Sequence, residues 1–345
     1  MNNSITHAPD TAHTPTTQTI HPDGQHARNR NAEEHTESTS SVIAAIAANI
    51  AIGIVKFIAA AISGSSAMIS EGIHSIVDSG NGLLILLGIK KSKQPADKTH
   101  PFGYGKELYF WTLVVAIMIF ALGGGFSIYE GAQHMQEVAR GHVEIGNTGL
   151  NYIVLVISAI IEGLSLRVAI KTFNEARGSS SVFSFIKQAK DPSLFTVVLE
   201  DSAALSGLLV ALVGVTLTHV FQNPYFDGAA SIIIGLLLAG VAVILLRETK
   251  GLLIGEGADK HTIERIEQLV ESNAFVVECG RILTMYMGPH DMLVALDATF
   301  TPDATRDDIM YAIDDIEASI VQELPDVTRI FIESESLRTT LQPSL

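Results

Sequence analysis

Six long apolar segments restrict this chain to a membrane-spanning fold, because about 20 apolar residues in a helix cross the core of a bilayer. Hydrophobic residues make up 47% of the 345 residues, and the mean hydropathy is +0.32 although both ends of the chain are polar. We therefore predict a transmembrane domain of six helices over residues 41–250. Their approximate ranges are 42–62, 66–89, 108–130, 150–172, 193–219 and 228–247.

Two of these segments carry ionisable side chains, which commonly mark an ion pathway because each costs about 2.5 kcal/mol or more at the centre of a membrane helix. The second segment contains Glu71, His74 and Asp78, and the fifth contains Glu200 and Asp201. His74 and Asp78 are four residues apart, so on a helix an imidazole nitrogen and a carboxylate become neighbours. Such a pair can bind a divalent metal ion.

The fifth segment is expected to supply a further ligand to this pair. Adjacent helical residues point about 100° apart, so only one of Glu200 and Asp201 can face the second segment squarely. We choose Asp201 and keep Glu200 in reserve. Glu71, Glu200 or water could then complete a tetrahedral site. The alternative is a buried His74–Asp78 hydrogen bond that only holds helices together.

Two other features of the apolar segments concern packing. Gly123, Gly124 and Gly125 in the third segment are predicted to let another helix approach closely. Lys56 in the first segment could pair with an acidic residue of the bundle, but we expect it to extend toward the membrane surface.

The charges of the connecting loops predict the orientation in the membrane. Lys and Arg residues gather in every second loop and after the sixth segment, whereas the other loops contain only Arg140. By the positive-inside rule, both termini are then cytoplasmic. The residues concerned are Lys90, Lys91, Lys93, Lys98, Lys106, Lys171, Arg177, Lys187, Lys190, Arg247 and Lys250.

Residues 257–336 have the pattern of a small cytoplasmic α+β domain. Helical and strand patterns alternate in the order α-β-β-α-β, and a turn sequence at 288–291 joins the first two strands. This order predicts helices on one face of an open sheet, with Cys279 inside a strand. Residues 1–40 form a polar tail with several His residues that we expect to be disordered, and 337–345 a flexible tail.

Composition and motifs exclude several classes of protein. The net charge of −15 argues against a nucleic-acid partner, which would need clustered Lys and Arg. The sequence has no GxxxxGK[ST] motif for ATP and no HExxH pair of a metalloprotease. We therefore expect a protein that is not an enzyme and holds no cofactor. The first forty residues lack the apolar run of a signal peptide, so we expect none.

Two motifs carry a resemblance to a known family. The run SGSSAMISEGIHSIVDSGNG covers Ser63 to Gly82, and QPADKTHPFGYGKELYFW covers Gln94 to Trp111. Both resemble the cation diffusion facilitators, membrane exporters of zinc and related divalent metals. The resemblance extends through the six segments and the α-β-β-α-β region, and it implies a ferredoxin-like cytoplasmic domain and a homodimer.

The resemblance also implies roles for individual residues. His74 and Asp78 would form half of a transport site, with Asp201 facing them. Many relatives have a His or Asp four residues before that carboxylate, but this chain has Val197, which brings Glu200 or Glu71 forward as the fourth ligand. In the loop after the second segment, Asp97 and His100 match a metal-binding pattern of some relatives, although Tyr104 replaces a further His.

Together these observations predict efflux of a divalent cation across a lipid bilayer by exchange for protons. Zn²⁺ is the first candidate because it suits mixed imidazole and carboxylate ligands, and Fe²⁺, Mn²⁺ or Co²⁺ are the alternatives. A metal-responsive scaffold that is only anchored in the membrane is a further alternative. We place the protein in the plasma or inner membrane.

Overall fold

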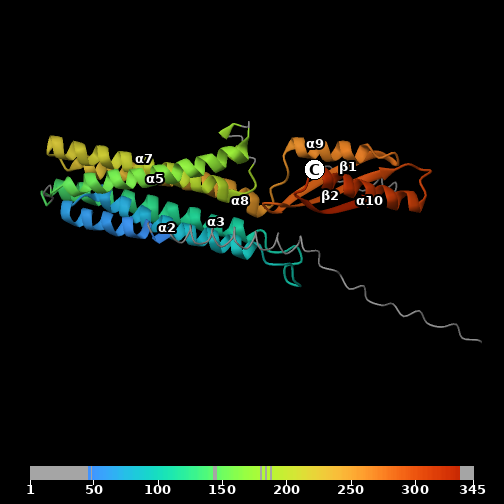
Figure 1. Cartoon of the computed structure of the whole chain (residues 1–345), viewed down its shortest axis with the longest axis horizontal. Helices are drawn as coiled ribbons and strands as arrows, with labels where there is room; N and C mark the ends of the chain where they lie inside the picture. The colour runs from blue at the N-terminus through green and yellow to red at the C-terminus, as the bar shows by residue number, and fades with distance from the viewer. Residues whose placement is uncertain are drawn as a thin grey trace, which may run out of the picture. The chain divides into compact units, whose positions relative to one another are not determined.

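The computed structural model describes residues 46–47, 49–142, 146–178, 181–182, 185–186 and 189–334. The two predicted tails lie outside these residues, and so does the start of the first apolar segment. The described chain contains a bundle of long helices followed by a small domain with a β-sheet (Figure 1).

Five helices in the described part of the chain are long and apolar enough to cross a membrane, and they coincide with the second to sixth predicted segments. The first predicted segment is described as the shorter apolar helix Asn49–Ser63. The chain is thus a multi-pass membrane protein. The five spans are α2 (Ser66–Ser92), α3 (Glu107–Met118) with η1 (Ile119–Gly125) and α4 (Phe126–Ala139), α5 (Gly149–Arg177), α7 (Pro192–Phe221) and α8 (Tyr225–Ile254).

Local sequence explains where the helices begin and end. Ser65 caps α2 by accepting a hydrogen bond from the backbone of Met68, and Asp191 caps α7 just before Pro192. Both cap types satisfy N–H groups that have no partner in the first turn. At the end of α8, Gly255 has a φ of 105°, a left-handed conformation that favours glycine.

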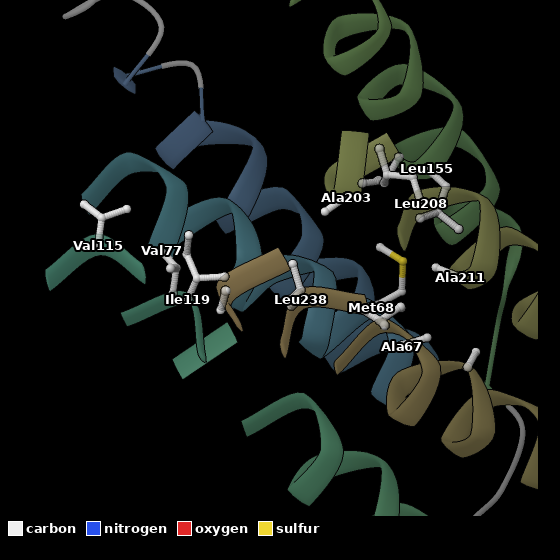
Figure 2. Packing of buried hydrophobic residues seen from close by; sticks show 14 of the residues in the cluster. Ala67, Met68, Val77, Val115, Ile119, Leu155, Ala203, Leu208, Ala211 and Leu238 are labelled. Carbon is white, nitrogen blue, oxygen red and sulfur yellow. The ribbon is translucent and has the colours of Figure 1, made fainter. Parts of the chain in front are cut away.

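The helices enclose an apolar core to which several spans contribute (Figure 2). Met68 of α2, Leu155 of α5, Leu208 of α7 and Leu238 of α8 are among its fully buried side chains. α2 contacts α3, α4, α7 and α8, so other helices pack against it on several sides.

Glycines bring α8 close to the third span, as the Gly123–Gly125 run led us to expect. A Cβ atom at Gly235 of α8 would lie 2.7 Å from the carbonyl oxygen of Gly124, and one at Gly131 of α4 would lie 2.6 Å from that of Gly228. The three glycines of the run lie in the π-helical segment η1. Small residues at these crossings therefore set the distance between the helices.

The C-terminal domain has the predicted α-β-β-α-β order. It consists of α9 (Lys260–Glu271), β1 (Val276–Gly288), β2 (Asp291–Phe300), α10 (Arg306–Glu323) and β3 (Val327–Ser334). β2 is the central strand, antiparallel to β1 and parallel to β3. Alternate residues of β2 point inward from Met292 to Ala298 and pack with α9 and α10, and Cys279 is buried in β1.

We predict that Gly235→Ala destabilises the bundle, because the new methyl group would press on the backbone of the third span. Overpacking of this kind costs about 1–3 kcal/mol. Thermal unfolding of the purified protein in detergent should show a lower Tm. Gly240→Ala, on the same helix but with nothing within 4 Å of the new methyl group, is the matched control and should not lower the Tm. Equal Tm values for both variants would contradict the close approach.

Candidate metal site

His74 and Asp78 form a buried pair on α2, as their spacing predicts. His74 Nε2 lies 3.3 Å from Asp78 Oδ2, and the two side chains are 4% and 13% exposed. His74 Nε2 and Asp78 Oδ1 have no hydrogen-bond partner. The pair therefore presents a nitrogen and a carboxylate oxygen that are available to bind a cation.

Glu71, a candidate ligand, is engaged by Lys56 of the preceding helix. Lys56 Nζ lies 2.9 Å from Glu71 Oε2 and 2.9 Å from Ser75 Oγ, to which it donates a hydrogen bond, and both charged side chains are fully buried. The expectation that Lys56 extends to the membrane surface is wrong, because the buried Glu71 carboxylate offers it a partner. Glu71 Oε1 is unpaired and lies next to Gly207 of α7.

The two acidic residues of α7 turn toward different neighbours. Asn81 of α2 donates a hydrogen bond of 2.9 Å to Glu200, and Ser165 of α5 donates one of 2.8 Å to Asp201. Both carboxylates nevertheless interact electrostatically with that of Asp78. The structure therefore turns Glu200 toward α2 and Asp201 toward α5, the reverse of the choice made from the sequence.

Glu162 of α5 joins this acidic region, although it was not among the candidate ligands taken from the sequence. It is buried and interacts electrostatically with Asp78 and Asp201. An acidic residue in the middle of a 29-residue apolar helix was the available signal. The region thus holds carboxylates from three helices and the imidazole of His74.

Within the described residues, no three His, Cys, Asp or Glu side chains are grouped closely enough to hold one metal ion. His74 and Asp78 supply two ligands. A third from α7 would require Asp201 to leave Ser165, or Glu200 to leave Asn81. Val197 is exposed on the surface of α7 and contributes no ligand.

Asp97 and His100 lie in the exposed loop between α2 and α3. Asp97 Oδ1 accepts hydrogen bonds from the hydroxyl and backbone of Thr99 and from the backbone of His100, and Oδ2 accepts one from Tyr104. These bonds, above all that from the Thr99 hydroxyl, hold the pKa of Asp97 well below its usual range. The carboxylate therefore orders the loop. These hydrogen bonds do not test whether Asp97 and His100 bind a metal ion, so that role stays a prediction.

The sequence matches the family of cation efflux transmembrane domains over residues 42–254, which is more than half of the chain. The matched region contains the five described spans and the His74–Asp78 pair. The chain belongs to the cation efflux family.

Two relatives illustrate the range of similar proteins. Metal tolerance protein C4 of Arabidopsis thaliana is 31% identical over 254 residues, which are 73% of this chain and 55% of that protein. The human mitochondrial proton-coupled zinc antiporter SLC30A9 is 32% identical over 223 residues, which are 64% of this chain and 39% of that protein. The chain thus spans about half or less of the length of these relatives.

We predict that Lys56→Met strongly destabilises the bundle, because it leaves the Glu71 carboxylate buried without a counter-charge. Breaking a buried ion pair on one side costs about 3–5 kcal/mol. The Tm in detergent should fall steeply for this variant and recover in part for Lys56→Met with Glu71→Gln. Lys98→Met, in the exposed loop, is the control and should leave the Tm unchanged. A Tm for Lys56→Met equal to that of the control would refute the pairing.

Proposed function

We propose that this protein exports a divalent metal cation from the cytoplasm in exchange for protons, with Zn²⁺ as the first candidate. The observation that carries the proposal is the buried His74–Asp78 pair, whose free nitrogen and oxygen lie beside acidic residues of α5 and α7. Membership of the cation efflux family and the zinc antiporter among its relatives support the same function.

The charges of the region suit a doubly positive cargo. Lys56 compensates Glu71, whereas Glu162, Glu200 and Asp201 form no ion pair with Lys or Arg in the described part of the chain, and Asp78 pairs with the imidazole of His74. Several carboxylates without counter-charges are costly in a membrane interior. A divalent cation or bound protons would each relieve this cost, so metal and protons can replace one another there.

The chemistry of the ligands couples the two ions. Only a neutral imidazole and an ionised carboxylate bind metal, so metal binding at His74 and Asp78 has to displace protons. A cation that enters from one side would be released where protons are more abundant. Rocking of the helices between two orientations would then expose the same site to each side in turn.

The positions of the basic residues support an orientation for this exchange. Lys and Arg gather in the loops at the end of the bundle where α8 leads into the C-terminal domain. By the positive-inside rule, this domain and both termini lie in the cytoplasm. We assign the protein to a plasma or inner membrane. The name of the human relative instead gives a mitochondrial location for that protein.

The C-terminal domain offers a surface for a second copy of the chain. Leu283, Ala295 and Phe331 are in register across the three strands, and Leu283 and Phe331 are exposed. Their face of the sheet is opposite to the one covered by α9 and α10, because the inward residues of β2 alternate with Ala295. A homodimer through this sheet would bury that apolar row.

The test is metal flux into liposomes that contain the purified protein under an imposed pH gradient. His74→Ala and Asp78→Asn should each reduce Zn²⁺ flux and the accompanying proton flux to the level of empty liposomes, because each removes a ligand. His261→Ala, an exposed His of α9, is the control and should retain full flux. Full flux in both site variants would refute the site.

Competition in the same assay ranks the cargo ions. Zn²⁺ should outcompete Mn²⁺, Fe²⁺ and Co²⁺ if His74 is a ligand, because imidazole favours zinc over manganese. Stronger competition by Mn²⁺ would instead indicate a site made mainly of oxygen ligands and would overturn the assignment of zinc. Such a site is compatible with Val197, which stands where many relatives have a His or Asp ligand.

A further inference from the structure

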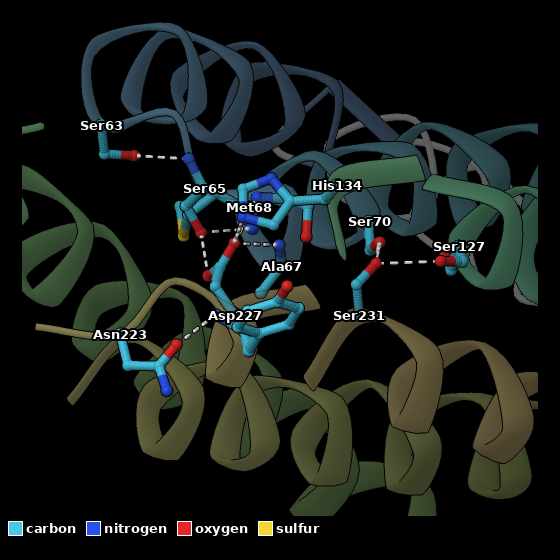
Figure 3. A network of polar contacts seen from close by, with 12 residues as sticks. Ser63, Ser65, Ala67, Met68, Ser70, Ser127, His134, Asn223, Asp227 and Ser231 are labelled. Carbon is cyan, nitrogen blue, oxygen red and sulfur yellow. Dashed lines mark hydrogen bonds and ion pairs between the residues drawn. The ribbon is translucent and has the colours of Figure 1, made fainter. Parts of the chain in front are cut away.

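A second polar cluster lies at the other end of the bundle, where α2, α5 and α8 begin and α4 and α7 end (Figure 3). It surrounds a small cavity of about 20 Å³. The polar side chains that line the cavity are Ser63, Ser65, His134, Thr148, Asn151, Thr218 and Asp227. None of them belongs to the His74–Asp78 region.

Asp227 is fixed in this cluster by the first turn of α2. Its carboxylate accepts hydrogen bonds of 2.6 Å from Ser65 Oγ, 2.5 Å from the backbone N–H of Ser66 and 3.3 Å from that of Ala67 (Figure 3). A helix N-terminus favours a negative charge. These three hydrogen bonds hold the carboxylate at the start of α2, where it is only 3% exposed.

Four polar atoms around the cavity have no partner. His134 Nε2, both polar atoms of the Asn151 amide and Thr218 Oγ1 are buried without a hydrogen bond, and His134 is only 7% exposed. Leaving such an atom unsatisfied costs about 1–3 kcal/mol. The cavity exceeds the roughly 10–15 Å³ that one water-sized occupant needs. The arrangement therefore calls for a polar occupant.

The spacing of His134 and Asp227 fits a metal ion. His134 Nε2 lies 3.9 Å from Asp227 Oδ2, which is too long for a hydrogen bond. Zn–N and Zn–O bonds measure about 2.0–2.2 Å, so two atoms that bind one zinc ion lie at most about 4.2 Å apart. The observed separation is within this limit.

We propose that the cavity is a second cation site, in which His134 and Asp227 bind the transported divalent ion before it leaves. The amide oxygen of Asn151, the Thr218 hydroxyl or water would complete its ligands. This inference rests on the proposed function, since it takes the same cargo.

A polar stripe of α2 connects the two sites. Ser66, Ser70, His74 and Asp78 follow one another at intervals of four residues, so each lies next to the one before in a row that turns gradually around the helix. Ser70 Oγ lies 2.5 Å from Ser231 Oγ, which donates a hydrogen bond to the backbone of Ser127 (Figure 3). At 1.5 Å per residue, Ser66 and His74 are about 12 Å apart along the helix. An ion could pass between the sites along these oxygen atoms.

Calorimetric titration of the purified full chain with Zn²⁺ tests the second site. The background variant His74→Ala with Asp78→Asn disables the first site. Adding His134→Gln should remove one equivalent of bound Zn²⁺ per chain or weaken that binding at least tenfold. Adding His142→Gln, an exposed His beyond the end of α4, is the matched control and should change nothing.

Unchanged Zn²⁺ binding after His134→Gln would overturn the second site and leave water as the occupant. If that variant does not fold, Asp227→Asn takes its place with the same expected loss, because it removes the charge of the other proposed ligand, and unchanged binding would again overturn the proposal. Because the titration requires no transport, its outcome is separate from that of the flux assay. Flux without His134-dependent binding refutes only the second site, and absent flux refutes the proposed function.

Discussion

The cost of burying charge inside a membrane is the constraint on which this structure depends. Each buried ionisable group of α2 has a specific neighbour: Lys56 beside Glu71, and Asp78 beside His74. In the first pair Lys56 already neutralises the charge of Glu71, although Glu71 Oε1 makes no hydrogen bond, so we interpret this pair as structural. The second is left incompletely bonded, and its free atoms make it the place where a cation gains most.

α2 connects the features of the bundle, because its first turn and its middle both contact functional side chains of other helices. Its first turn holds the Asp227 carboxylate, its middle carries the His74–Asp78 pair, and Asn81 further along bonds Glu200 of α7. Rearrangement of α2 against α7 would therefore change the metal ligands and the hydrogen bonds of Glu200 together. A transporter that alternates between two orientations needs such a shared element.

The sequence predicts most of the fold but only the local part of the site. Spans and the α-β-β-α-β order follow from hydropathy and periodicity, and the His74–Asp78 contact follows from the four-residue spacing on one helix. Contacts between helices depend on how each helix is rotated, which hydropathy does not define. For this reason Lys56 was placed wrongly, Ser165 and Asn81 were not foreseen as partners of the α7 carboxylates, and the cluster around His134 and Asp227 was missed.

The central claim is that His74 and Asp78 bind the transported ion together with a carboxylate of α7. A crystal structure of the protein grown with Zn²⁺, with anomalous diffraction recorded at the zinc absorption edge, tests it most directly. We predict an anomalous peak within bonding distance of His74 Nε2 and Asp78, with Asp201 or Glu200 turned away from its present partner to reach it. Zinc bound elsewhere, with the His74–Asp78 pair still in direct contact and no peak beside it, would contradict the account.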